Sequence, residues 1–299
     1  MPSPLAPPFL LGVLVALLYV RGRRRHMRVV APGHRAGLGW RAVAFWSGLV
    51  TLVLALDSVI DDEADRLFWV HMVQHALLMM VAAPLLVLAA PWIPIWKGLP
   101  LSTRRGLGAA YMRSPGWRAA RAVGRRLAAP VAVWVLFSLD LAVWHVPVLY
   151  GATLRHQWIH DLEHVSFLVL AVLFWAQVIE SPPLKARLPE AWRVAYVTLE
   201  ATVCWVLAMV LAFAPSPLYS GYSELGSRPG GLSALADQQL AAGIMWGPGS
   251  IPFAIFVFVA LYRWLGGRST EPPWPQSGVR DATADPPRRA AVGSLAPRS

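Results

Sequence analysis

The sequence contains little charge and almost no cysteine. Only 14% of its 299 residues are charged and 56% are hydrophobic, whereas about 25% charged residues are usual in a soluble domain. Its single cysteine, Cys204, can form neither an intramolecular disulfide nor a CxxC metal clip. A Walker A loop, a GxSxG elbow and an HExxH zinc motif are also absent. Because no hydrolytic constellation is present, we expect that the protein is not an enzyme.

Long apolar runs dominate the chain, and its mean hydropathy is +0.49. A spanning helix needs about 20 mainly apolar residues, so we predict an all-α integral membrane bundle of about seven transmembrane helices. The runs lie at residues 4–20, 41–60, 67–96, 129–149, 157–179, 192–214 and 237–262. We interpret the first as a retained helix because it lacks the features of a signal peptide. Prolines should bend or end the third run near Pro91 and break the seventh near Pro248.

Basic residues alternate between the connections of the predicted helices. Of the 27 Lys and Arg, only Arg66, Arg155 and Arg228 fall in the second, fourth and sixth connections. This positive-inside pattern predicts an outer N-terminus and a cytoplasmic C-terminus. The net charge of +11 therefore indicates a lipid bilayer as partner and no nucleic acid. We expect a seven-helix transmembrane domain at residues 1–265 and a disordered cytoplasmic tail at 266–299.

Histidines recur at helical spacing near the outer ends of the predicted helices. His71 and His75 are four residues apart on the third helix, as are His160 and His164 on the fifth. Ionisable residues in a membrane are costly and are functional candidates by default. Imidazole suits copper, zinc and iron, and thioether favours Cu(I). The predicted metal ligands are His71, His75, His145, His160, His164, Met79, Asp237 and Met245.

Two carboxyl groups, Asp140 and Glu200, lie within the fourth and sixth predicted helices. A buried carboxyl group must be protonated or paired, so each either makes a structural hydrogen bond or belongs to a proton or ion path. A further acidic cluster, at residues 57–65, follows the second predicted helix. We interpret it as a solvated outer loop, or as a group of charges that attracts a cation toward the histidines.

Several short blocks resemble a known family when they are taken together and in order. They are His71-Met72-Val73-Gln74-His75, Ala83-Pro84-Leu85-Leu86, Trp144-His145-Val146-Pro147, His160-Asp161-Leu162-Glu163-His164, Pro217-Leu218-Tyr219 and Asp237-Gln238-Gln239. This ordered set, spread over residues 40–262, resembles the CtaG family of cytochrome c oxidase assembly factors. The resemblance implies a multi-pass protein of the bacterial plasma membrane that is needed to assemble caa-type oxidase. Copper is then the expected cargo, and oxidase subunits and an extracytoplasmic copper chaperone are the expected partners.

Four functional hypotheses follow from these observations. The first is an assembly factor that binds copper at its outer face and delivers it to an oxidase subunit. The second is a metal-free assembly scaffold in which histidines form hydrogen bonds between helices. The third is a membrane haem protein with His75 and His164 as axial ligands. The fourth is a metal or proton transporter, because interrupted helices often mark transport sites.

Overall fold

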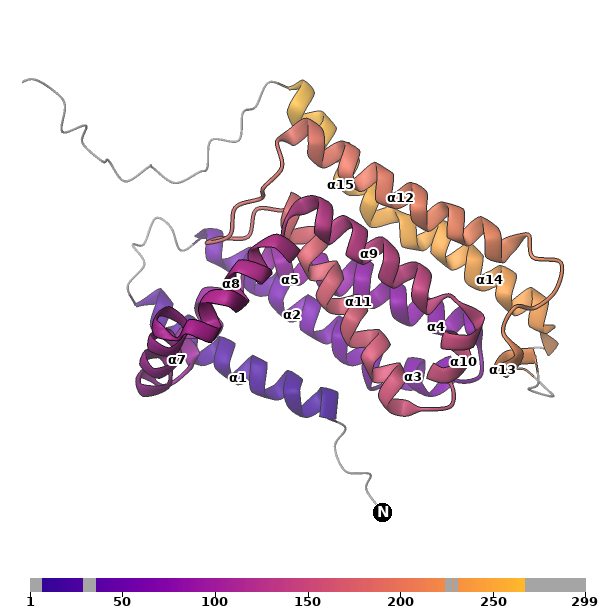
Figure 1. Ribbon diagram of the computed structural model, residues 1–299, viewed down its shortest axis with the longest axis horizontal. Coiled ribbons are helices and arrows are strands. Elements are labelled where there is room, and N and C mark those ends of the chain that lie inside the picture. The colour runs from indigo at the N-terminus through magenta and orange to yellow at the C-terminus, as the bar shows by residue number, and fades with distance from the viewer. Residues whose placement is uncertain (1–6, 29–35, 224–227, 229–230, 267–299) are drawn as a thin grey trace, which may run out of the picture.

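The protein folds as an assembly of helices, as the sequence predicts (Figure 1). A computed structural model describes residues 7–28, 36–223, 228 and 231–266. Within this part of the chain, helices are the only extended regular elements, and Ser181 and Leu184 form an isolated bridge. The all-α fold class is therefore confirmed. The disordered tail predicted for residues 266–299 lies outside the described residues, except for Gly266.

Five helical segments of the described chain are long and apolar enough to cross a membrane. They are α2 (Ala36–Leu56), the α4–η2–α5 segment (Phe68–Ala76, Leu77–Ala82 and Ala83–Ala89), α11 (Gln157–Val178), α12 (Glu190–Ala212) and the α14–η4–α15 segment (Ala234–Trp246, Pro248–Ser250 and Ile251–Leu265). A sixth candidate is the pair α8 (Pro115–Leu127) and α9 (Pro130–Trp144), which bends by 76°. Residues 7–20 of the first predicted span are helical, within α1 (Pro7–Met27), but the apolar part of this helix ends at Val20.

Short helices connect these segments. Two of them, α3 (Val59–Ala64) and α6 (Trp92–Gly98), flank the α4–η2–α5 segment. The remaining short helices are α7 (Leu101–Arg113), α10 (Pro147–Thr153) and α13 (Ser220–Ser223). The basic connection at residues 97–126 is thus mostly helical, and neither α7 nor α8 has a buried residue. Figure 1 shows α7 and α8 at one end of the molecule and α3, α10 and α13 at the other.

The helix interruptions lie where proline and glycine predict them. Helix α5 ends at Ala89, and Ala90 adopts a left-handed conformation with φ of 48°. The seventh predicted helix is interrupted by η4 between Trp246 and Ile251. The π-helix η2 was not predicted. Its wider turns are visible where Ala83 N–H donates to the carbonyl oxygen of Leu78, five residues back.

The largest hydrophobic core lies between α5, α9, α11, α12 and α15. Trp175 is its bulkiest fully buried side chain, and its ring stacks on Phe253 with centroids 5.6 Å apart. The Trp175 indole N–H donates to the carbonyl oxygen of Met79 at 3.0 Å. Aromatic packing and this hydrogen bond therefore fasten α11 to the π-helix that follows the histidines of α4.

Two glycines allow α1 and α6 to make very close backbone contact. A methyl group on Gly22 would overlap the carbonyl oxygen of Pro94, and one on Gly98 would overlap that of Leu18. We predict that Gly98→Ala forces the helices apart and costs about 1–3 kcal/mol, as overpacking usually does. A lower Tm in detergent would show this. Gly106→Ala is the matched control, because nothing lies within 4 Å of the added methyl group, and its Tm should not fall.

Candidate metal centre

Histidines of α4 and α11 meet around a carboxylate in the interior of the protein. His71, His75, Glu163 and His164 each offer one ligand atom, and these four atoms all lie within 4.8 Å of one another. Each of the four side chains is at most 5% exposed. The i, i+4 spacing places His71 and His75 on the same face of α4, one turn apart. Glu163 and His164 approach them from α11. We call these four residues the His/Glu centre.

The separations in the His/Glu centre suit ligands around a common ion. His71 Nε2 lies 3.6 Å from one Glu163 carboxylate oxygen, and His75 Nε2 lies 3.7 Å from the other. These distances are too long for good hydrogen bonds. Two ligand atoms bound about 2.1 Å from a tetrahedral metal ion are about 3.4 Å apart. The two histidine–carboxylate pairs are therefore spaced for a bridging ion rather than for direct contact.

Several polar atoms of the centre lack hydrogen-bond partners among the described residues. Among the described residues, neither oxygen of Glu163 has a hydrogen-bond partner, and the same holds for Nε2 of His71, His75 and His164. A buried polar atom left unpaired costs about 1–3 kcal/mol, and more if it is charged. Several such atoms converge on one small space here. A bound cation would satisfy them together, so the residues fit a metal ion.

A hydrogen-bonded network orients His71. The Tyr222 hydroxyl donates to the carbonyl oxygen of Ala64 at 2.7 Å and lies 3.3 Å from His71 Nδ1. With its own proton directed at Ala64, Tyr222 accepts from Nδ1–H of His71. This fixes the tautomer that leaves the Nε2 lone pair facing Glu163. Metal-binding histidines are commonly held in this way through their second ring nitrogen.

The acidic segment before α4 is tied to the same helix. The Gln74 side-chain amide donates to the carbonyl oxygen of Ala55 at 2.8 Å and to the Asp61 carboxylate at 2.6 Å. Burial raises the pKa of Asp61 above its ordinary value. Asp57, Asp62 and Asp65 are exposed, as expected of solvated acidic residues. These charges lie in and beside α3, which packs on the helix that carries His71 and His75.

The other predicted ligands fall into separate places. The ring of His160 lies beside the centre, with its centroid 4.1 Å from that of His164 and 5.3 Å from that of His71. By contrast, His145, Met79 and Met245 line a small cavity on another side of His75. Another histidine, His156, lies four residues before His160 and is exposed at the start of α11. The sequence pattern thus assigned to one metal site residues that the structure places in different locations.

The prediction that Asp237 joins the ligand set needs correction. Its two carboxylate oxygens accept the backbone N–H groups of Phe68 and Trp69, each at 3.0 Å. They therefore satisfy N–H groups at the start of α4, where a helix has no internal partners for them and where negative charge is favourable. Arg228 Nε also lies 3.5 Å from this carboxylate. Asp237 anchors the helix that carries the histidines instead of joining them.

Glu163 was left out of the predicted ligand set although it forms the middle of the centre. The available signal was its position three residues after His160 and directly before His164. Its location between the two histidines of α4 depends on helix packing, which the sequence pattern does not give. The two carboxyl groups predicted within the fourth and sixth helices, by contrast, each have an identified donor. The Ser138 hydroxyl donates to Glu200 at 2.7 Å, and the Trp144 indole donates to Asp140 at 3.0 Å.

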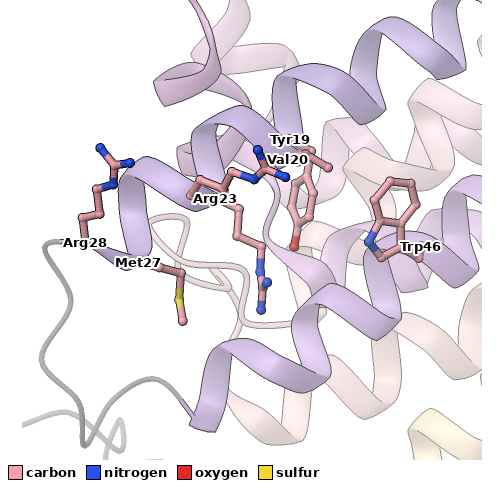
Figure 2. A pocket seen from close by; sticks show the side chains of 7 residues that line it. Tyr19, Val20, Arg23, Met27, Arg28 and Trp46 are labelled. Carbon is pink, nitrogen blue, oxygen red and sulfur yellow. The ribbon is translucent and has the colours of Figure 1, made fainter.

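A larger pocket of about 410 Å³ lies between α1 and α2 and has a different character. Figure 2 shows Tyr19, Arg23 and Trp46 among its lining side chains. Arg24 and Arg28 also border it. Because guanidinium groups repel cations, this pocket is no alternative to the His/Glu centre as a metal site.

The chain matches the model of the cytochrome c oxidase caa3 assembly factor family over residues 17–266. It belongs to this family. The chain is also 26% identical to uncharacterized proteins of Mycobacterium bovis, over 262 residues, and Mycobacterium leprae, over 259 residues. These alignments cover 85% of this chain but only 38% of each relative, so the chain spans well under half the length of the curated relatives. No solved structure matches it.

Family membership confirms the resemblance found in the sequence and associates this chain with oxidase assembly. Residues 17–266 include every residue of the His/Glu centre and the helices that position them. The metal-fitting geometry therefore lies within the part of the chain that the family shares. Neither the family description nor the names of the relatives assigns a metal to it.

We predict that the purified protein binds added copper at this centre and that Glu163→Gln weakens the binding by about tenfold or more, because it removes the only negative charge among the four candidate ligands. Glutamine has nearly the same shape, so the fold should be retained. Titration against a competing copper chelator in detergent would measure the change. His156→Ala is the control, since His156 directly precedes the same helix but lies outside the centre. Equal affinity for the wild type and Glu163→Gln would contradict a ligand role for this carboxylate.

Proposed function

We propose that this assembly factor binds copper at the His/Glu centre and delivers it to a subunit of a caa-type cytochrome c oxidase in the bacterial plasma membrane. The observation that carries the proposal is the convergence of buried, unpartnered imidazole nitrogens and carboxylate oxygens in the described chain. Imidazole ligands are suited to copper. The family supplies the link to cytochrome c oxidase. Copper is the cargo that the sequence resemblance implies, and an extracytoplasmic copper chaperone would supply the ion.

The distribution of charge supports an arrangement with the centre near the outer face. Arg25, at the basic end of α1, donates to the carbonyl oxygens of Lys97 and Leu99, which places two basic connections at one end. Figure 1 shows α3 and α10 at the opposite end from α7 and α8. By the positive-inside rule the basic end is cytoplasmic. We therefore propose seven spans, with α1 as the first, an outer N-terminus and a cytoplasmic C-terminus.

Delivery requires that copper be held and then released. The centre offers three imidazoles and one carboxylate, and His160 adds a further imidazole whose Nε2 has no hydrogen-bond partner in the described chain. Its ring contacts that of His164. A neighbouring spare ligand allows one metal–ligand bond to form as another breaks. The ion can thus move toward a partner protein while it keeps its ligands. This matters because an unpaired charge in the protein interior is costly.

The geometry also bears on the alternative functions. Histidines that only joined helices by hydrogen bonds would have partners across the interface, yet Nε2 of His71, His75 and His164 has none among the described residues. A haem between His75 and His164 would need room for a porphyrin. Their ring centroids are only 5.3 Å apart, and the cavity beside His75 measures about 30 Å³. These features favour a small ion over both alternatives.

In a host that lacks its own copy of the protein, we predict that His71→Ala and Glu163→Gln fail to restore oxidase activity, whereas His156→Ala restores it. The oxidase from the first two strains should contain less copper, because the donor site is lost. Copper content and oxygen consumption of the purified oxidase would measure this, with immunoblotting to show equal amounts of each variant. Full copper content with His71→Ala and with Glu163→Gln would reject copper delivery by this centre.

A further inference from the structure

A second cavity adjoins the His/Glu centre and is lined by sulfur. It measures about 30 Å³, enough for one water-sized guest. The sulfur-bearing residues come from α4, η2, α12 and α14, and His145 follows α9. The donors that line it are Met72, His75, Met79, Met80, His145, Cys204 and Met245. We call this space the thioether cavity.

His145 is held like a metal ligand within this cavity. It lies at the end of α9 and is only 8% exposed. Its Nδ1–H donates to the carbonyl oxygen of Leu141 at 2.8 Å, so Nε2 carries the lone pair. That Nε2 has no hydrogen-bond partner in the described part of the chain. Burying a ring nitrogen without a hydrogen-bond partner among methionines costs free energy, and hydrophobic packing alone does not compensate for that cost.

The geometry points to the thioether cavity as a second metal site, which binds Cu(I) through Cys204, Met79, Met245 and Nε2 of His145. Thiolate and thioether are soft ligands that favour Cu(I). On binding, the sulfur–copper bond replaces the S–H bond of Cys204, and the proton leaves to solvent. The thiolate then neutralises the single charge of Cu(I), which avoids an unpaired charge in the protein interior. The metal keeps its oxidation state, so no electron donor is needed.

His75 connects the thioether cavity to the His/Glu centre. Its Nε2 lies 3.7 Å from Glu163, and its side chain also lines the cavity. Its Nδ1 is another buried atom without a hydrogen-bond partner among the described residues.

The π-helix η2 begins two residues after His75 and carries Met79 and Met80, both of which line the cavity. π-Helical turns are frequent at functional sites. The identity of the metal rests on the proposed function; the existence of a second site rests on the cavity.

The test is anaerobic titration of the purified full chain with Cu(I) against a chromogenic chelator, combined with X-ray absorption at the copper edge. We expect about two copper ions per wild-type chain and sulfur among the ligands. The triple variant Cys204→Ala/Met79→Leu/Met245→Leu should bind about one ion without sulfur ligands. Leucine nearly conserves the volume of methionine, so packing should survive. Met112→Leu on the exposed helix α7 is the matched control and should behave like the wild type.

A reciprocal variant separates this inference from the proposed function. His71→Ala/His164→Ala should lose the ion of the His/Glu centre and retain one copper with sulfur ligands. A wild-type chain that binds copper only through nitrogen and oxygen would overturn the second site and leave the proposed function intact. Sulfur ligation that persists in the triple variant would also overturn it. A wild-type chain that binds no copper under these conditions would overturn both.

Discussion

The organisation of this protein depends on the burial of one carboxylate among imidazoles. Glu163 is fully buried and has no hydrogen-bond partner among the described residues. In a membrane interior no water is available to compensate such a group, so it needs a cation or a proton. His71 and His75 approach its two oxygens from the facing helix. The arrangement is costly when empty and favourable when an ion joins the ligands, which suits a carrier of metal.

The surrounding elements hold this arrangement in place. Asp237 caps the start of α4, and the Tyr222 hydroxyl sets the orientation of His71. On the other side, Trp175 binds the carbonyl oxygen of Met79 and fastens α11 to the π-helix. These contacts join segments that are far apart in sequence. They confine the ligands before any ion binds, so that little ordering is required on binding.

The two adjoining donor sets differ in chemistry and share one residue. The His/Glu centre offers imidazole and carboxylate, whereas the thioether cavity offers mainly sulfur, together with Nε2 of His145. His75 borders both. Acidic residues lie beside the centre in and around α3, and the arginine-lined pocket of Figure 2 lies apart between α1 and α2. The acidic segment and the arginine-lined pocket thus lie in separate parts of the molecule.

The sequence by itself determined the helical class, the apolar segments, their interruptions near Pro91 and Pro248, and the family. These follow from local composition and from the period of the helix, which a single chain displays directly. Helical spacing likewise paired His71 with His75. Only the tertiary structure decided that Glu163 faces them, that Asp237 caps α4 instead, and that Met79 and Met245 line another cavity. The reason is that the spacing of residues along the chain determines which side chains share one face of a helix. It does not determine which other helix packs against that face, because that depends on contacts between distant segments.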